Sequence, residues 1–172
     1  MGVRDRTILA LAHDAGLRRD EIESIDIEHL DWANSRVWVR AKKRTSRVSI
    51  SLNQDVLTEI KKWLVHRGED PGALFKNFDP AEKGERLTGT SIGRICKKYG
   101  LGHIHGVRHL AITEALEVTN GNIVEVMKFS RHSDPKTVMI YDDNRKNVSG
   151  AISAKLAELR KGNTDNGTGD QK

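Results

Sequence analysis

The chain has 172 residues, enough for one domain with a tail and for a hydrophobic core that needs no disulfide bonds. Its 29 Lys and Arg residues outnumber 24 Asp and Glu residues, and the formal net charge of +5 suits a polyanionic partner such as nucleic acid, although charge alone fits a merely basic protein equally well. The single cysteine excludes an internal disulfide framework, and the short apolar runs predict no transmembrane or signal segment, so we expect a cytoplasmic protein without a membrane partner.

The first third of the chain is predicted to pass from helix to strand. Residues 4–16 carry apolar side chains at helical spacing, with a glycine where the helix would end, and residues 18–25 are predicted to form a second short helix. Over residues 36–52, valines and isoleucines instead alternate with polar residues, as they do in strands. With turns over 31–36 and 42–46, this predicts a three-stranded antiparallel meander whose second, basic turn projects from the sheet.

The rest of the chain is predicted to be helical apart from a loop over 69–89. A helix between the N-cap Asn53 and Gly68 presents one apolar stripe, and Pro135 after the cap Asp134 marks the start of another helix. Further helices are predicted over residues 90–100, 106–118, 121–130 and 145–160.

The order of these elements predicts a fold class. It is a mainly helical α+β fold, in which a small three-stranded antiparallel sheet packs with about seven helices. We expect residues 1–161 to form the domain, and the polar, glycine-rich residues 162–172 to be a disordered tail.

Six polar side chains share a chemistry, although each alone has an ordinary explanation. They are Arg18, Lys43, His105, Arg108, His132 and Tyr141. Taken singly, such a residue is more often a surface charge, a solvated turn residue or an amphipathic packer. Together, guanidinium forks match phosphate oxygens, histidine donates to phosphate or accepts a proton, lysine protonates a leaving alkoxide, and tyrosine forms a covalent ester with phosphorus. The set therefore indicates phosphoryl transfer on a DNA backbone without a metal.

In order and spacing these residues resemble the catalytic domain of the tyrosine recombinases, the phage integrase family that includes Xer, Cre and lambda integrase. The stretch "RDRTILALAHDAGLRRDEI" resembles the family's first box, with Arg18 as its first arginine and Glu21 as the acidic residue that braces the site. The stretch "RAKKRTSRVSI" resembles the hairpin that carries the family's lysine. That lysine falls on Lys43, with Lys42 as its close rival, and the resemblance makes it the general acid for the leaving 5′-oxygen.

Two later stretches complete the resemblance, which covers residues 4 to about 158. "HGVRHLAIT" resembles the box that supplies His105 and Arg108, and "SRHSDPKTVMIY" the box that supplies His132 and Tyr141. The resemblance implies that Tyr141 attacks the scissile phosphate and leaves a 3′-phosphotyrosyl enzyme and a free 5′-hydroxyl. Arg18, Arg108 and His132 would hold the phosphate, and His105 would assist proton transfer at the tyrosine. A second strand would then reseal the DNA, so no cofactor, neither ATP nor a metal, is expected.

The sequence departs from the family's pattern in two places. Arg131 stands where the glycine of an L-G-H motif is expected, and it could add a DNA contact or mark a different local backbone. We expect Arg131 to bind DNA together with Lys42, Arg44 and Arg47 of the basic turn. The chain also begins almost at the first box, so the family's separate N-terminal core-binding domain is expected to be absent, at a cost in phosphate contacts.

The resemblance also implies partners. Double-stranded DNA is the expected ligand, and the full-length protein is expected to form a tetramer on DNA in the nucleoid, whereas the isolated domain should be a monomer. The predicted helix over 145–160 fits two arrangements, because its apolar stripe could pack on its own domain or dock on a neighbouring protomer.

Three other functions remain open at this point. A DNA-binding regulator derived from an integrase would keep the basic surface but would not need all six residues. A type IB topoisomerase would use the same chemistry on one strand. A zinc site could be built from Cys96, His103, His105 and His109, although their spacing lacks the pairs that are typical of structural zinc modules.

Overall fold

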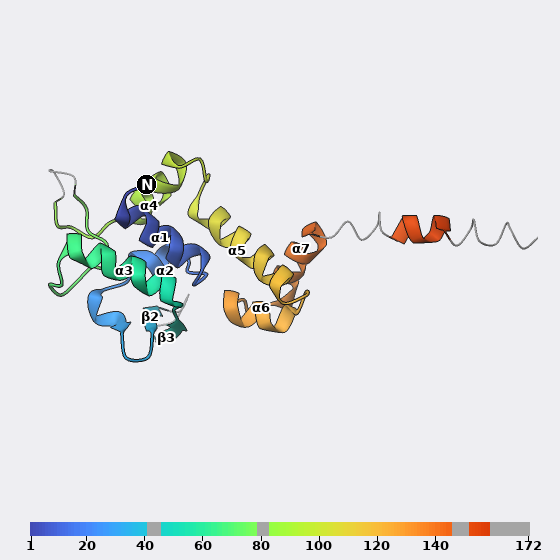
Figure 1. The fold of residues 1–172 in the computed structure, drawn as a ribbon, viewed down its shortest axis with the longest axis horizontal. Coiled ribbons are helices and arrows are strands. Elements are labelled where there is room, and N and C mark those ends of the chain that lie inside the picture. The colour runs from blue at the N-terminus through green and yellow to red at the C-terminus, as the bar shows by residue number, and fades with distance from the viewer. Residues whose placement is uncertain (41–45, 79–82, 146–151, 159–172) are drawn as a thin grey trace, which may run out of the picture.

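The computed structural model describes residues 1–40, 46–78, 83–145 and 152–158. The helices are α1 (Val3–His13), α2 (Arg19–Glu23), the short 3₁₀-helix η1 (Ile27–His29), α3 (Gln54–Arg67), α4 (Gly89–Lys98), α5 (Ile104–Val118), α6 (Ile123–Ser130) and α7 (Pro135–Arg145). The strands are β1 (Leu30–Asp31), β2 (Arg36–Arg40) and β3 (Arg47–Ser51). This confirms the predicted α+β class, which is mainly helical with one small sheet (Figure 1).

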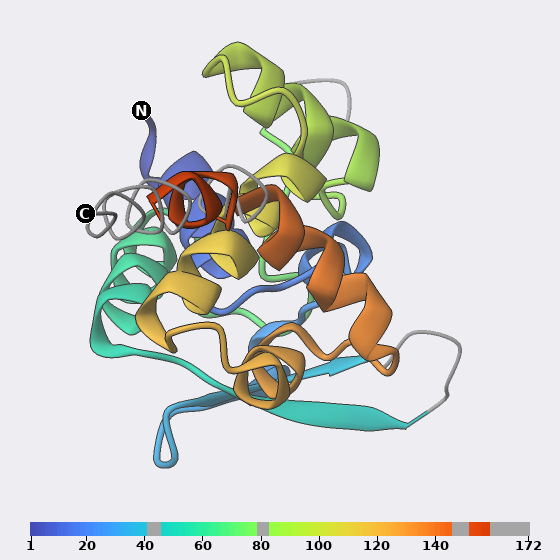
Figure 2. The ribbon, with the colours of Figure 1, turned by 90° about the vertical axis from the view of Figure 1, so that its right-hand side faces the viewer.

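The sheet is the predicted antiparallel meander, with strand order β1-β2-β3. Val37 and Val39 of β2 are fully buried, whereas Arg36, Trp38 and Arg40 are exposed, so the alternation in the sequence sorts the two faces of the sheet. Figure 2 shows this sheet along the lower edge of the molecule, with α6 and α7 on the side that faces the viewer. The turn that joins β2 to β3 at residues 41–45 lies outside the described residues.

Local capping signals set the ends of several helices as predicted. The Asn53 side chain accepts a hydrogen bond of 2.8 Å from the Val56 N–H at the start of α3, and Gly68 follows its end at a φ of 82°. Asp134 likewise accepts a bond of 2.9 Å from the Lys136 N–H, which caps α7. These contacts span only a few residues, which explains why the sequence predicts them well.

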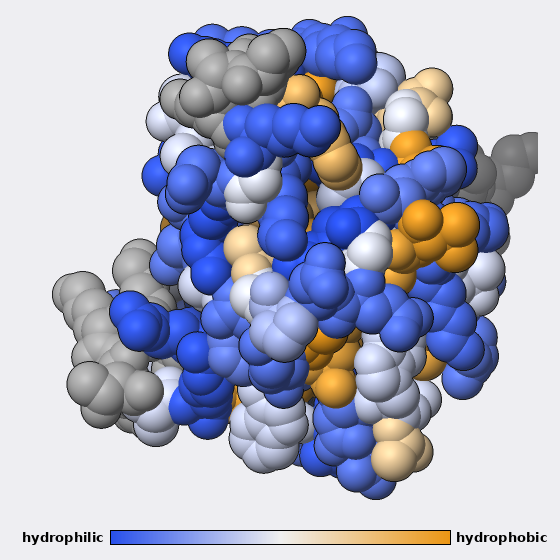
Figure 3. All heavy atoms as spheres, turned by 90° about the vertical axis from the view of Figure 1, so that its left-hand side faces the viewer, coloured by the Kyte–Doolittle hydropathy of each residue, from blue (hydrophilic) through white to orange (hydrophobic). Residues whose placement is uncertain are grey.

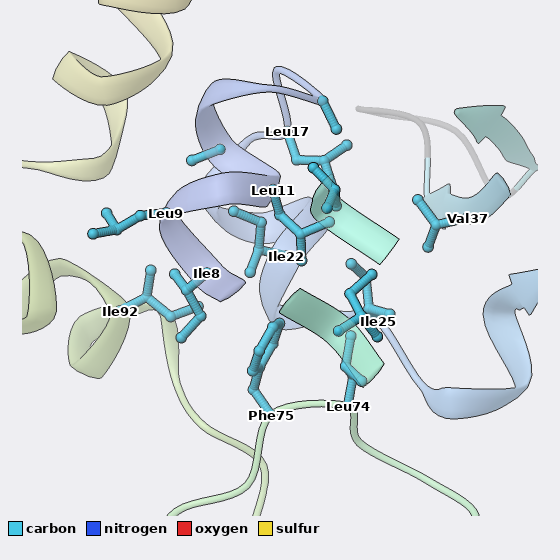
Figure 4. Close-up of a cluster of buried hydrophobic side chains, with 14 of the residues drawn as sticks. Ile8, Leu9, Leu11, Leu17, Ile22, Ile25, Val37, Leu74, Phe75 and Ile92 are labelled. Atoms are coloured by element: carbon cyan, nitrogen blue, oxygen red, sulfur yellow. The ribbon is translucent and has the colours of Figure 1, made fainter. Parts of the chain in front are cut away.

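Two hydrophobic clusters meet along α5. The larger cluster gathers α1, α2, the sheet, α3 and α4, and Figure 4 shows its centre around Ile8, Leu11 and Ile22. The smaller one joins α5, α6 and α7 through the buried residues Ile112, Leu116, Val126 and Val138. The first turns of α5 belong to the larger cluster and its later turns to the smaller, so α5 crosses between the two parts of the fold (Figure 1). Residue 108 falls between these two packed regions.

The surface away from α6 and α7 is largely hydrophilic, with scattered apolar patches (Figure 3). In the part of the chain that the structure describes, no helix is long and apolar enough to span a bilayer. Of the helix predicted over 145–160, residues 152–158 are described and helical. Their side chains are exposed, so Ile152 and Leu156 of the predicted apolar stripe are not buried on the domain. The predicted tail, residues 162–172, lies outside the described residues.

Candidate active site

Three arginines from distant parts of the chain meet where α1, α5 and α6 come together. Arg18 is the N-cap residue of α2, Arg108 lies in the middle of α5, and Arg131 follows the last residue of α6. The turn after α1 brings the backbone toward them through Gly16, which has a φ of 56°. A side chain at Gly16 would also meet the Phe129 ring, which lies 3.0 Å from the position of a Cβ atom. Glycine is therefore required at this turn both for its backbone conformation and for space.

Arg108 is the largest of the fully buried side chains among the described residues, with 1% of its surface exposed. Its guanidinium donates hydrogen bonds to the carbonyl oxygens of Gly16 and Ser130, and so ties α5 to the turn after α1 and to the end of α6. Burial, together with the positive charges of Arg18 and Arg131, lowers the pKa of Arg108 to about 10. The side chain nevertheless stays charged at neutral pH.

Arg18 is held by the carboxylate predicted to brace it. Its Nη1 donates to Glu21 Oε1 at 2.8 Å, while its own backbone N–H donates to Glu21 Oε2 at 2.7 Å. Its Nη2 lies 3.4 Å from the Ser130 carbonyl oxygen and 3.1 Å from that of Arg131. The structure thus brings Arg18, Glu21 and Arg108 together, as the sequence predicted for the site.

Glu21 is the shared counter-ion of this cluster. Its side chain is almost fully buried and forms ion pairs with both Arg18 and Arg131. Burial opposes its ionisation, but the charges of Arg131 and Arg18 and the hydrogen bond from the Arg18 backbone outweigh burial, so the pKa of Glu21 lies below its ordinary value. Two of the three guanidiniums pair with Glu21 and the third, Arg108, bonds to backbone carbonyls, so these four side chains have a formal excess of two positive charges.

Arg131 is turned inward rather than toward a polyanion. Its Nη2 donates to Glu21 Oε2 at 2.7 Å and to the Gly16 carbonyl at 2.8 Å, and its Nη1 donates to the Phe129 carbonyl at 3.1 Å. Its backbone is left-handed, with a φ of 55°, so it keeps the conformation that glycine would adopt in the L-G-H motif. The geometry therefore argues against the predicted DNA contact and for a role in supporting Glu21.

His132 lies beside this cluster and is neutral at physiological pH. Burial, together with the positive charges of Arg108, Arg18 and Arg131, lowers its pKa to about 4. Its Nδ1 is 3.1 Å from the Ser130 hydroxyl, which orients the ring. The ring lies nearly parallel to that of Tyr141, with centroids 6.4 Å apart.

The two tyrosines of the chain have different surroundings. Tyr99 donates its hydroxyl proton to Asp5 at 2.8 Å and packs against the larger core cluster. Tyr141 packs against the smaller cluster, and its hydroxyl oxygen is 3.1 Å from Nε2 of His109. Burial raises the pKa of Tyr141 although Arg108 acts in the opposite direction, so the phenol keeps its proton at neutral pH.

The sequence analysis chose a different histidine as the partner of Tyr141. His105 is exposed, and its ring lies 4.2 Å from that of His109, whereas His109 contacts the tyrosine hydroxyl. His105 and His109 are four residues apart and therefore lie on one face of α5, so their spacing alone could not separate them. In the sequence, His109 stood out only as one ligand of the zinc alternative.

The zinc alternative finds no support in the described residues. Cys96 is fully buried in the larger core cluster, and burial raises the pKa of its thiol. No three His, Cys, Asp or Glu side chains in the part of the chain that the structure describes are gathered closely enough to hold a metal ion.

A cavity of about 660 Å³ opens beside the arginine cluster. Its lining includes Arg18, Arg108, His105, His132 and Thr137. All of these except Thr137 are predicted site residues, so an anionic ligand in this cavity would meet four of the six.

The predicted basic turn can be placed only in part. Lys42, Lys43 and Arg44 lie outside the described residues. Arg47 begins β3, is exposed, and lies opposite Arg40 in the ladder, with its Nη1 3.3 Å from Nδ1 of His29. Two like charges that face each other across a ladder destabilise it unless a polyanion lies nearby.

Comparison with known proteins adds a family match. Residues 1–147 match the sequence model described as "Phage integrase family". The chain is 35% identical over 167 residues to the tyrosine recombinase slr0733 of Synechocystis sp. (strain ATCC 27184 / PCC 6803 / Kazusa), covering 92% of this chain and 53% of that protein. It is 30% identical over 151 residues to the tyrosine recombinase XerC of Salmonella typhi, covering 82% and 48%. The chain spans about half the length of the curated relatives it matches.

Two solved structures share the fold. The XerA recombinase matches with a TM-score of 0.66 at 20% identity, covering 92% of this chain and 57% of that one. The XerH site-specific recombinase, bound to a palindromic difH substrate in a post-cleavage complex, matches with a TM-score of 0.67 at 21% identity, covering 88% and 45%. At this level of identity the likeness confirms the predicted fold.

Proposed function

Because the chain belongs to the phage integrase family, as its match over residues 1–147 establishes, we propose that it is the catalytic part of a site-specific DNA recombinase. It would cleave and rejoin DNA through a covalent tyrosine intermediate. The observation that carries this proposal is the cluster of three guanidiniums with one carboxylate beside a cavity, where the ring of His132 in the cavity lining stacks on the ring of Tyr141.

The charge of the cluster supports a phosphate ligand. Buried charges are normally paired, and among the described residues Glu21 is the carboxylate that pairs with this cluster, which leaves a formal excess of two positive charges. A phosphodiester supplies one negative charge and gains another as it becomes five-coordinate, so the cluster stabilises the transition state more than the ground state. Neutral His132 can donate a ring N–H to a phosphate oxygen at the same place.

The reaction proceeds by two transfers to phosphorus. In the first, the bond between Tyr141 Oη and phosphorus forms while the bond from phosphorus to the 5′-oxygen breaks, and a 5′-hydroxyl is released. In the second, a 5′-hydroxyl of the partner strand attacks the phosphotyrosine and the phenol leaves. Lys43, outside the described residues, is the proposed donor of the proton to the leaving 5′-oxygen. The tyrosyl ester conserves the energy of the phosphodiester, so the cycle needs no ATP.

Double-stranded DNA is the proposed partner, and the full-length protein is proposed to act as a tetramer on it. The basic net charge and the exposed Arg36, Arg40 and Arg47 of the sheet support a polyanionic partner. The exposed Ile152 and Leu156 support docking of the last helix on a neighbouring protomer rather than on its own domain. The presence of Tyr141, His132 and both phosphate-facing arginines favours an enzyme over a binding-only regulator.

A trapping experiment tests the proposal. The protein is mixed with nicked duplexes that have the sequence of the DNA flanking its own gene. The mixture is then denatured, and mass spectrometry detects any protein–DNA adduct. Tyr141→Phe is the test variant and Tyr99→Phe the matched control, because Tyr99 bonds to Asp5 away from the arginines.

We expect an adduct with the wild-type protein and with Tyr99→Phe, and none with Tyr141→Phe. An adduct that survives in Tyr141→Phe would refute the assignment of the nucleophile. Salt-dependent DNA binding without any adduct, also in a full-length protein, would favour the binding-only function.

A further inference from the structure

The Tyr141 hydroxyl is held by a histidine that the sequence analysis did not assign to the reaction. In the described residues its hydrogen bond is to His109, with 3.1 Å between Oη and Nε2. We infer that His109 is the group that takes the phenolic proton when Tyr141 attacks phosphorus and returns it when the tyrosine leaves. This inference rests on the function proposed above and replaces His105 in that role.

The arrangement of α5 and α7 selects His109 over His105. The rings of His109 and Tyr141 meet edge to face, with centroids 4.7 Å apart. The ring contacts of His105 are with His103 and His109, so its path to the tyrosine hydroxyl runs through His109. A proton acceptor needs to lie within hydrogen-bond reach of the proton that it takes, and His109 meets that requirement.

The protonation states on both sides of the contact suit this transfer. Tyr141 keeps its proton because burial raises its pKa, so its attack requires an acceptor. Burial, with the charges of His103 and Arg108, lowers the pKa of His109, so the ring is neutral at physiological pH. The groups that face it are His105 and Arg108 on α5, His103 at the N-cap of α5, and Tyr141 on α7. If the ring carries its proton on Nδ1, the lone pair of Nε2 points to the phenol.

The transfer balances in both directions. As the Oη–phosphorus bond forms and the bond from phosphorus to the 5′-oxygen breaks, the phenolic O–H bond breaks and its proton moves to Nε2, which makes His109 an imidazolium. In the resealing step, the phosphotyrosine bond breaks and the imidazolium returns the proton to the departing phenolate. Arg108 makes the imidazolium unfavourable, which assists that return.

A purely structural role for His109 predicts different results from a proton acceptor. His109→Phe keeps a planar ring against Tyr141 but has no acceptor, and His109→Gln offers an oxygen that accepts a hydrogen bond but does not hold a proton at neutral pH. His105→Gln tests the other candidate acceptor, and His66→Gln, at an exposed position of α3 away from the site, is the control. All four variants leave the arginine cluster and its contacts with Glu21 in place.

The test measures adduct formation by the full chain on the nicked duplexes, with either oxygen or sulfur at the scissile 5′-position. A thiolate leaves without a proton, so sulfur restores a variant that lacks the general acid but not one that lacks the acceptor for the phenolic proton. We expect His109→Phe and His109→Gln to slow cleavage by about 10²–10⁴-fold with both substrates. His105→Gln should lose less activity than His109→Gln, His66→Gln should match wild type, and the His109 variants should bind the duplex as wild type does.

Three outcomes would overturn the inference. They are cleavage by His109→Phe near the wild-type rate, recovery of His109→Phe with the sulfur substrate, or a large loss in His105→Gln alone. In each case the wild-type adduct would still form, so the proposed function would survive. If the wild-type full-length protein formed no adduct, both the inference about His109 and the proposed function would be refuted.

A second measurement needs no DNA. Nitrogen-15 NMR of the histidine rings reports which nitrogen carries the proton. We expect His109 to carry it on Nδ1 with Nε2 bare in the wild-type protein, and to lose that preference in Tyr141→Phe. A protonated Nε2 at neutral pH would mean that the ring donates to the phenol, and would refute the inference.

Discussion

Replacement of Arg131 by methionine tests whether this arginine supports the site from inside. The change removes its charge-assisted hydrogen bond to Glu21, and bonds of this kind contribute about 1.5–3 kcal/mol. It also removes the donors to the Gly16 and Phe129 carbonyls, but it relieves repulsion from Arg18 and Arg108. We take the loss of the two carbonyl hydrogen bonds and the relief of the repulsion to offset each other. Arg131→Met should therefore lower the free energy of unfolding by about 2–3 kcal/mol.

Arg131→Gly separates the side-chain contacts from the backbone. Glycine adopts the left-handed conformation at residue 131 without the strain that costs another residue about 1 kcal/mol or more. We therefore expect Arg131→Gly to be less destabilised than Arg131→Met by about 1 kcal/mol. Urea unfolding of the two variants and of wild type measures both differences. A methionine variant as stable as wild type would refute the reasoning, because the inward contacts would then contribute nothing.

DNA binding distinguishes the inward role of Arg131 from the contact that the sequence predicted. An arginine that neutralises a phosphate contributes about 0.9 to the slope of log affinity against log salt. We expect Arg131→Met to keep the wild-type slope and to slow cleavage, because Glu21 then holds Arg18 less firmly. A slope smaller by about one would instead establish Arg131 as a DNA contact.

Three further predictions concern the same site. Gly16→Ala should destabilise the fold by about 1–3 kcal/mol and slow cleavage, because the new Cβ strains the backbone and meets the Phe129 ring. Urea unfolding and the trapping assay measure the two effects, and unchanged stability would show that glycine is not required at residue 16. The His132 pKa lies at about 4 instead of 6.5, so its contribution to stability is fully present above pH 6.5 and falls as the pH drops toward 4. Urea unfolding at pH 7 and at pH 4.5 should show this loss of stability. A His132→Gln variant that loses as much stability between these two pH values would contradict it. The pKa of Glu21 is lowered, so its contribution to the free energy of unfolding is lost as the pH falls below about 4.5. In Glu21→Gln the free energy of unfolding should therefore depend less on pH below about 4.5 than in wild type.

Interactions within a few residues explain what the sequence could predict. The alternation around Val37 and Val39 fixes which face of β2 is buried, and Asn53 and Asp134 each cap a helix through an N–H two or three residues away. These predictions of strand faces and helix ends held because each depends on the periodicity or the hydrogen-bonding groups of one short segment. The order of the boxes pointed to Arg18 and Arg108, which the structure brings together and whose role in the reaction stays a prediction.

The sequence by itself therefore determined the fold class, the helix ends and the residues suited to a phosphate. Only the tertiary structure decided that Arg131 turns inward to Glu21, which lies 110 residues earlier in the chain, and that Tyr141 meets His109 rather than His105. The two histidines share one face of α5, so the choice depends on where α7 packs along that face. Such contacts depend on the packing of distant segments around Arg108, and no local pattern of residues encodes that packing.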